Sequence, residues 1–177
     1  MDKNIFYTAE IQPEVKKKLA FIQLLVTDCD GVLTDGRIYY GSNGGEYKAF
    51  FARDGKGLKM VQDEGIICAI ITGRDSPMVD HRARELGITE VYQGISDKSV
   101  VLNKLMGKYD LEPKETAYIG DDINDLGALR ACGLSAAVGD AVSKVKAEVD
   151  YVTRRRGGRG AVRELIDLLL KFRKESR

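Results

Sequence analysis

The stretch from Leu24 to Gly36, "LLVTDCDGVLTDG", joins a short apolar run to two acidic residues and a glycine. Apolar residues without alternation are typical of a strand that is covered by helices on both faces. Asp28 and Asp30 follow the run directly, with only Cys29 between them. Along an extended strand end, residues two apart point to the same side. The stretch therefore predicts a buried strand that presents two carboxylates together where it ends.

The rest of the chain repeats this unit of an apolar run followed by a segment with helical periodicity. The further runs are "IICAIIT", "VYQG", "TAYIGDD", "LSAAVGD" and "DYVT". Apolar runs that alternate with helices indicate a parallel sheet with helices on both faces. We therefore predict a doubly wound, Rossmann-like α/β fold. It forms a single domain over residues 1–177, with a core at 24–170 and an N-terminal extension before it.

Composition limits the classes of function. The 177 residues include 28 Lys plus Arg against 27 Asp plus Glu, a formal net charge of +1, and 44% of them are hydrophobic. A near-neutral chain without a basic block gives no reason to expect a nucleic-acid partner. Three cysteines, far apart in the chain, offer neither a disulfide framework nor a paired metal motif. No apolar run approaches the ~18 residues that span a bilayer, so we expect a cytoplasmic protein without a membrane partner.

One segment interrupts the alternation of strands and helices. Residues 37–51, "RIYYGSNGGEYKAFF", place two aromatic-rich runs around a glycine-rich turn. This pattern predicts a β-hairpin inserted after the first strand.

Polar side chains gather where the predicted strands end. In an open α/β sheet the ligand lies beyond the carboxyl ends of the strands. Besides the first pair of aspartates, these ends carry Thr72, Lys98, Asp121, Asp122 and Asp125. A cluster of carboxylates needs a cation to stay ionised, and oxygen ligands select a hard ion such as Mg²⁺. The sequence therefore predicts a magnesium site that acts on phosphate.

Each residue type has a role in phosphoryl transfer. Asp28 can attack phosphorus and form an aspartyl-phosphate, while Asp30 gives and takes the proton. The hydroxyl of Thr72 and the ammonium of Lys98 can hold phosphoryl oxygens. The alternative is a phospho-accepting receiver module, which gathers similar residues but does not turn over. The order of the motifs disfavours it, because here an acidic pair comes first and a second acidic cluster follows the lysine.

At these residues the sequence resembles the haloacid dehalogenase superfamily of phosphohydrolases. "DCDGV", Thr72, Lys98 and "GDDIND" match its four motifs in order. The resemblance implies that Mg²⁺ is held by the side chains of Asp28 and Asp121 and by the backbone carbonyl of Asp30. It also implies that Asp122 and Asp125 act through water or through contacts with those ligands.

Longer strings narrow the resemblance. The matching strings are "DCDGVLTDGRIYY", "FFARDGKGLKM", "AIITGRDS", "AYIGDDINDL", "GLSAAVGDA", "DYVT" and "GGRGAVRE". They look like the 3-deoxy-D-manno-octulosonate 8-phosphate phosphatase family, which has no cap domain. Thr72 follows Asp30 by 42 positions, an interval that the hairpin and one helix already fill, so no cap fits here.

The family resemblance carries expectations about function. It implies hydrolysis of that sugar phosphate through an aspartyl-phosphate, in the making of lipopolysaccharide precursors. A related nine-carbon ulosonate phosphate is the alternative substrate. It also implies a ring-like homotetramer, in which the hairpins associate and a neighbour's glycine-rich C-terminal segment helps to close the site.

The substrate-binding residues also follow from the resemblance, together with the suitability of arginine for carboxylates. Beside Asp30 and Lys98, they are Phe51, Ala52, Arg53, Asp54, Gly55, Lys59, Arg74 and Arg82.

Overall fold

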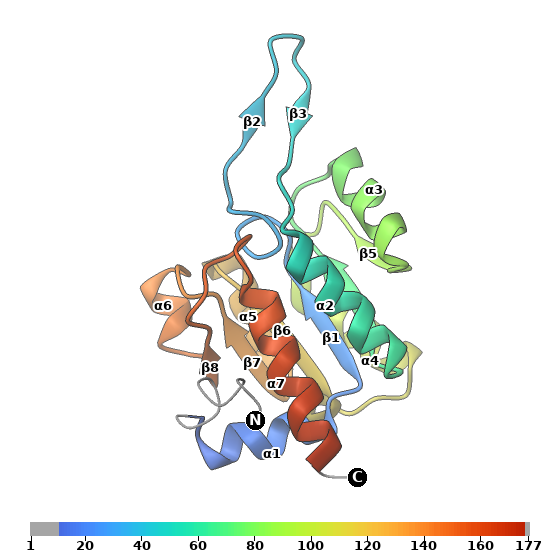
Figure 1. The fold of residues 1–177 in the computed structure, drawn as a ribbon, viewed down its shortest axis with the longest axis vertical. Helices are drawn as coiled ribbons and strands as arrows, with labels where there is room; N and C mark the ends of the chain where they lie inside the picture. Colours follow the sequence, from blue (N-terminus) through green and yellow to red (C-terminus); the bar gives the residue numbers. More distant parts are fainter. Residues whose placement is uncertain (1–10, 176–177) are drawn as a thin grey trace, which may run out of the picture.

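A six-stranded parallel sheet forms the centre of the structure, a computed structural model that describes residues 11–175 (Figure 1). Its strands are β1 (Leu24–Thr27), β4 (Ile67–Ile71), β5 (Glu90–Tyr92), β6 (Thr116–Gly120), β7 (Leu134–Ala137) and β8 (Tyr151–Val152). They lie in the order β5-β4-β1-β6-β7-β8. The doubly wound α/β fold expected from the sequence is confirmed, and each expected run contains a strand.

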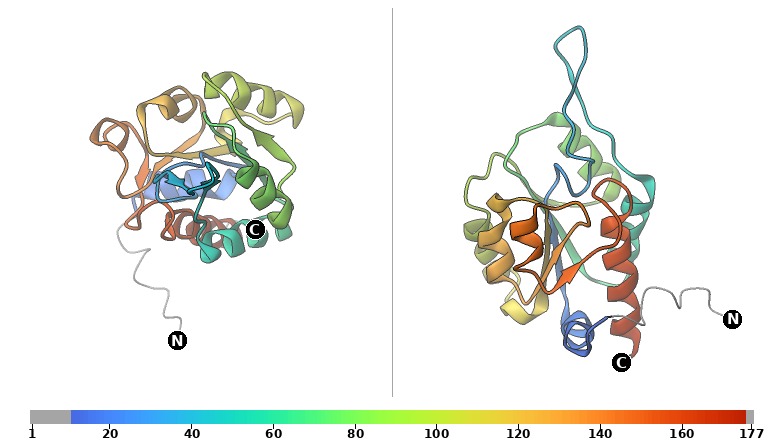
Figure 2. Two further views of the ribbon diagram at one scale, coloured as in Figure 1. Left: turned by 90° about the horizontal axis from the view of Figure 1, so that it is seen from above. Right: turned by 90° about the vertical axis from the view of Figure 1, so that its left-hand side faces the viewer.

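Helices cover both faces of this sheet. They are α1 (Pro13–Phe21), α2 (Ala52–Asp63), α3 (Pro77–Leu86), α4 (Lys98–Lys108), α5 (Leu126–Ala131), α6 (Ser143–Lys146) and α7 (Ala161–Glu175), with short 3₁₀ turns η1 (Pro113–Glu115) and η2 (Ile123–Asp125). Helices α2 and α7 pack against each other on one face, and α4 and α5 pack on the other (Figure 2). None of the described helices has the length and apolar character needed to cross a membrane.

The strand order places a crevice beside β1. From β1 the chain moves to β4 and β5 on one side, and then returns to β6, β7 and β8 on the other. In folds of this kind the ligand binds at the carboxyl edge where the winding direction reverses. Here that point lies between β1 and β6, which pair in register with Thr27 opposite Ile119.

The expected hairpin is present as strands β2 (Tyr39–Tyr40) and β3 (Glu46–Tyr47), which pair antiparallel. It extends away from the carboxyl edge of the sheet, far from both ends of the described chain (Figure 1). Its apolar side chains are largely uncovered: Tyr40 is 72% exposed and Tyr47 is 56% exposed. The hairpin therefore offers a large aromatic surface to solvent within this single chain.

Helix α1 departs from the expectation that the residues before 24 form an extension outside the core. The side chains of Val15, Leu19 and Ile22 are buried in the same apolar cluster as the central strands, and α1 packs against α7. The core therefore begins upstream of Leu24. The helix is hard to recognise because three lysines interrupt its narrow apolar stripe.

Candidate active site

Asp28 and Asp121 follow neighbouring strands at the crevice. Thr27 pairs with Ile119 across β1 and β6, and the backbone N–H of Asp28 continues this ladder by donating to the carbonyl of Ile119 over 3.1 Å. Asp121 follows β6 directly. Carboxylate oxygens of Asp28, Asp121 and Asp125 all lie within 4.8 Å of one another. The fold thus brings Asp28 to two acids that lie more than 90 positions later in the sequence.

Gly31 makes this approach possible. Its φ of +92° lies in the region that favours glycine, and a Cβ at this position would lie 2.1 Å from Oδ2 of Asp121. Any side chain here would displace the carboxylate of Asp121 from its place beside Asp28. The "DG" of the first motif therefore has a direct steric reason.

Lys98 is buried beneath the acids at the start of α4. Its Nζ lies 2.9 Å from Oδ1 of Asp28 and 2.6 Å from Oδ1 of Asp125, and its side chain has no exposed surface. Burial opposes its charge, but the carboxylates of Asp28 and Asp125 raise the pKa of Lys98 above its ordinary value. The ammonium is therefore a fixed positive charge beside Asp28.

Asp125 holds Lys98 and the loop after β6 in place. Its Oδ1 accepts the hydroxyl of Tyr118 at 2.8 Å as well as the ammonium of Lys98 at 2.6 Å. Its Oδ2 accepts the backbone N–H groups of Asp121 at 2.9 Å and Asp122 at 3.3 Å. Both oxygens are already engaged, so Asp125 is a poorer metal ligand than Asp28 or Asp121. Asp122 is exposed, and its side chain caps η2 through the N–H of Ile123.

The two remaining acids fit a divalent cation. Burial and then the charge of Asp125 raise the pKa of Asp28 to about 6. Burial and then the charge of Asp28 raise the pKa of Asp121 to about 8. At neutral pH Asp121 would therefore keep its proton unless a cation replaced it, whereas Asp28 is largely ionised. Oxygen ligands at this spacing suit Mg²⁺, and the side chains of Asp28 and Asp121 could hold it.

Asp30 is held by the hairpin through an ion pair with Lys48. The ammonium of Lys48, whose side chain is only 2% exposed, bonds to Oδ1 of Asp30 and lies 3.2 Å from Oε1 of Glu46. Glu46 Oε2 in turn accepts Nη2 of Arg74 at 2.7 Å, and Arg74 Nε lies 3.9 Å from Asp30 Oδ2. Sequence reasoning missed Lys48 and Glu46. Their spacing of two along a strand, which puts both side chains on one face, was the available signal.

Thr72 is buried at the end of β4, the neighbour of β1 on its other side. Its N–H donates to the carbonyl of Tyr92 at 2.9 Å, and its carbonyl accepts the N–H of Ile95 at 3.1 Å. Thr27 pairs with Ile70, so the next residue, Asp28, lies opposite Ile71. Thr72 is therefore one position further toward the carboxyl edge than Asp28. The hydroxyl therefore belongs to the same edge as the acids.

The expected substrate-binding residues are spread more widely. Arg74 joins the site through Glu46, as described above. Arg82 lies over the ring of Phe50, with its guanidinium against Gly55 and 3.2 Å from Glu85. At the start of α2, Phe51 is half-buried, and Ala52 and Arg53 are exposed.

Two residues of that set lie apart from the acids. Lys59 is exposed in the middle of α2, about two turns from its start at the catalytic edge. Asp54 is buried, and its two oxygens accept the N–H groups of Gly160 at 3.2 Å and Arg163 at 2.7 Å. In this structure Asp54 therefore joins α2 to the start of α7.

The glycine-rich segment has its partner within its own chain. A Cβ at Gly157 would lie 1.7 Å from the carbonyl oxygen of Gly31, and one at Gly158 would lie 2.4 Å from the backbone of Thr34. The N–H of Gly158 donates to the carbonyl of Val32 at 2.9 Å. Within the chain, these glycines allow the segment to pack against the loop after Asp30. Their expected part in a neighbouring subunit's site stays a prediction.

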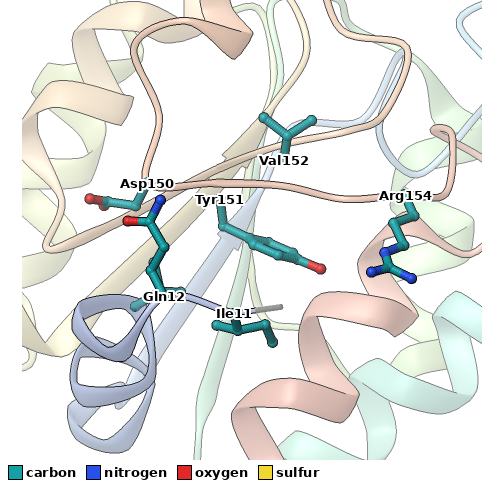
Figure 3. Close-up of a pocket in the computed structure, with 7 residues that line it drawn as sticks. Ile11, Gln12, Asp150, Tyr151, Val152 and Arg154 are labelled. Carbon is teal, nitrogen blue, oxygen red and sulfur yellow. The ribbon is translucent and has the colours of Figure 1, made fainter. Parts of the chain in front are cut away.

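A pocket of about 250 Å³ lies elsewhere, between the start of α1 and β8 (Figure 3). Its lining consists of Ile11, Gln12, Val15, Asp150, Tyr151, Val152 and Arg154. None of these is among the residues at the carboxyl edge. The pocket is therefore separate from the candidate site. The side chain of its Asp150 is already held by Lys18 and by Ser135.

Comparison with known proteins places the chain among phosphatases. Residues 84–165 match the model of a family described as haloacid dehalogenase-like hydrolase. The 3-deoxy-D-manno-octulosonate 8-phosphate phosphatase of Escherichia coli (strain K12) is 48% identical over 160 residues, covering 90% of this chain and 85% of that protein.

Solved structures give the same result. The phosphatase of that name from Yersinia pestis superposes with a TM-score of 0.90 at 45% identity, covering 92% of this chain and 88% of that one. The one from Moraxella catarrhalis, in complex with a magnesium ion, a phosphate ion and KDO, gives 0.89 at 46% identity, covering 92% and 93%.

Proposed function

The chain belongs to the 3-deoxy-D-manno-octulosonate 8-phosphate phosphatase family of haloacid dehalogenase-like hydrolases, and from this premise we propose how its residues divide the reaction. It is a phosphoric monoester hydrolase that uses Mg²⁺ and releases phosphate from 3-deoxy-D-manno-octulosonate 8-phosphate. The observation that carries this proposal is the meeting of Asp28, Asp121 and Lys98 at the crevice between β1 and β6. A receiver module is not retained, since the relatives are phosphatases along nearly the whole chain.

In the first step, an Oδ atom of Asp28 attacks phosphorus from the side opposite the sugar oxygen. A bond from Asp28 to phosphorus forms and the bond from phosphorus to the sugar oxygen breaks. Asp30 donates its proton to that oxygen, which leaves as a hydroxyl. The ammonium of Lys98, 2.9 Å from Asp28, keeps the nucleophile ionised.

In the second step, water attacks the aspartyl-phosphate. Asp30, now a carboxylate, takes the proton of the water as the bond from phosphorus to Asp28 breaks and phosphate is released. Both residues return to their starting states, so the cycle is balanced without another reactant.

The other residues hold charge and position. Lys98 and the hydroxyl of Thr72 hold phosphoryl oxygens, and Asp125 keeps Lys98 and the loop after β6 in place. The side chains of Asp28 and Asp121 and the carbonyl of Asp30 would hold Mg²⁺. When bound, this ion neutralises charge on the phosphoryl group. Asp122 supports the loop as the cap of η2.

The rim supplies the contacts with the sugar acid. We assign them to Arg74, Arg82, Arg53 and the backbone of residues 51–55, because guanidinium groups suit a carboxylate. We leave out Lys59 for its place along α2, and the side chain of Asp54 because its oxygens are engaged with α7.

Assembly and location complete the proposal. A homotetramer would cover the hairpin, whose Ile38, Tyr39, Tyr40 and Tyr47 are exposed in the single chain. We place the enzyme in the cytoplasm, in the making of lipopolysaccharide precursors, which is consistent with three cysteines that carry no disulfide.

The test is phosphate release from 3-deoxy-D-manno-octulosonate 8-phosphate with Mg²⁺, measured beside a nine-carbon ulosonate phosphate and simple sugar phosphates. We expect the highest kcat/KM for the octulosonate. Equal values for all of these esters would contradict the assigned substrate, and a higher value for the nine-carbon acid would reassign it.

A further inference from the structure

We propose that Lys48, at the base of the hairpin, is a positioning residue for Asp30. The inference rests on the proposed function, in which Asp30 moves the proton in both steps. It gives the hairpin a part in the chemistry in addition to its proposed part in assembly.

The contact is buried and specific. Lys48 lies 18 positions after Asp30 in the chain, and its ammonium bonds to Oδ1 of Asp30. Its side chain is 2% exposed, whereas that of Asp30 is 21% exposed. A lysine usually keeps its ammonium in water. Burial of this ammonium against one carboxylate oxygen therefore marks a built contact.

A second acid fixes the ammonium from the other side. Glu46, two residues earlier on the same face of the hairpin, lies 3.2 Å from Lys48 through Oε1. Its Oε2 accepts Nη2 of Arg74 at 2.7 Å, and Arg74 belongs to the loop that follows Thr72. The series Arg74, Glu46, Lys48 and Asp30 thus joins the hairpin to two loops of the active site.

The contact leaves the two oxygens of Asp30 in different situations. Oδ1 is bonded to Lys48, whereas Oδ2 is buried without a hydrogen bond from the described residues, with Arg74 Nε 3.9 Å away. Proton transfer needs an oxygen that is held in place but not already bonded. Lys48 therefore leaves Oδ2 as the oxygen that exchanges the proton.

Removal of the ammonium would also change the local charge. Without Lys48, the carboxylates of Glu46 and Asp30 would face each other across the space that it fills, and their repulsion would turn Asp30 out of position. Lys48 forms its ion pairs with Asp30 and Glu46, and Asp28 forms its own with Lys98, so attack on phosphorus would be retained.

The experiment compares Lys48→Met with Lys48→Arg, and uses Lys104→Met as the control because Lys104 is an exposed lysine on α4. The substrate is p-nitrophenyl phosphate, whose leaving group departs without a proton. The test is thus independent of which sugar phosphate the enzyme uses. Thermal unfolding verifies that each variant is folded.

In Lys48→Met we expect a rapid burst of about one p-nitrophenolate per active site. We then expect a kcat lowered by about 30-fold, less than the roughly 100-fold or more of fully lost general acid–base catalysis, because Asp30 itself is still present. KM should not rise, because formation of the aspartyl-phosphate is unimpaired. Lys48→Arg should restore most of the rate, and Lys104→Met should match the wild type.

A double-mutant cycle shows whether Lys48 acts through Asp30. In an Asp30→Asn background, Lys48→Met should lower the rate by less than about twofold. The inference is overturned if Lys48→Met keeps the wild-type kcat, if it loses rate without a burst, or if its loss persists unchanged in that background. Failure of the wild type to hydrolyse the octulosonate phosphate would instead contradict the proposed substrate. The measurements with p-nitrophenyl phosphate would still test the role of Lys48.

Discussion

The Nζ atom of Lys98 lies 2.9 Å from Oδ1 of Asp28, and neither side chain is more than 5% exposed. A buried ion pair depends on both partners, because removal of one leaves an uncompensated charge. We therefore expect Lys98→Met to lower the free energy of unfolding by about 3 kcal/mol. We also expect kcat to fall by at least about 100-fold. Urea unfolding and steady-state kinetics measure the two effects, and an unchanged kcat would contradict the role of Lys98.

Asp121 is expected to set the Mg²⁺ concentration that activity requires. Asp121→Asn removes one of two anionic ligands from a set of oxygens, and should raise the Mg²⁺ concentration for half-maximal activity by about 10- to 100-fold. Asp63→Asn is the matched control, because Asp63 is exposed at the far end of α2. Magnesium titrations of the two variants are compared. The assignment fails if both give the wild-type value.

Gly157 should be intolerant of even one methyl group. A Cβ there would lie 1.7 Å from the carbonyl oxygen of Gly31, so Gly157→Ala must displace the loop that carries Asp30. We expect a loss of about 2 kcal/mol in stability together with lower activity. Gly107→Ala is the control, since nothing lies within 4 Å of its Cβ and alanine favours a helix by roughly 1 kcal/mol. Opposite signs in urea unfolding are predicted, and equal signs would refute the close approach.

Glu90, on the edge strand β5, should make the stability of the protein depend on pH. Its carboxylate accepts hydrogen bonds from Lys108 at 2.6 Å, Tyr109 at 2.7 Å and Tyr92 at 2.7 Å. Burial opposes the charge, but these donors lower the pKa of Glu90 below its ordinary 4.5. A lowered pKa in the folded state stabilises the protein above pH 4.5, and this contribution is lost as pH falls through the folded pKa.

The matching variant is Glu90→Gln. It should reduce the free energy of unfolding at pH 7 by about 2 kcal/mol, and the difference from the wild type should shrink as pH falls below 4.5. Urea unfolding at several pH values measures this. A difference that grows toward low pH has the wrong sign for a lowered pKa.

The sequence predicted the sheet well because β1, β6 and β7 are buried along their whole length and so appear as apolar runs. The acids at the strand ends were also predictable, since they follow the runs directly. The contact between Lys48 and Asp30 was not, because it depends on how the hairpin folds back over the first loop. Asp54 matched a substrate motif but lies buried under α7, and only the packing of α7 reveals this.

Two other differences have similar causes. Helix α1 has too few apolar positions to stand out, and its place in the core is set by contact with α7 at the other end of the chain. Gly157 and Gly158 are adjacent and follow a basic run, and the family resemblance implies that this segment reaches a neighbouring subunit. Within their own chain they pack against the loop at residues 31–35, which is more than 100 positions away, so this contact could not be predicted from the sequence.

The central claim is that Asp28 carries the phosphoryl group between the two chemical steps. With p-nitrophenyl phosphate, whose leaving group departs without a proton, Asp30→Asn should slow the second step more than the first, so the intermediate should accumulate. The direct measurement is mass spectrometry of this variant, quenched in acid during turnover of p-nitrophenyl phosphate with Mg²⁺. The account predicts the mass of one phosphoryl group on the peptide that contains residues 24–36, and its loss when Asp28→Asn is added. A phosphoryl group on another residue, or unmodified protein while phosphate is still released, would contradict it.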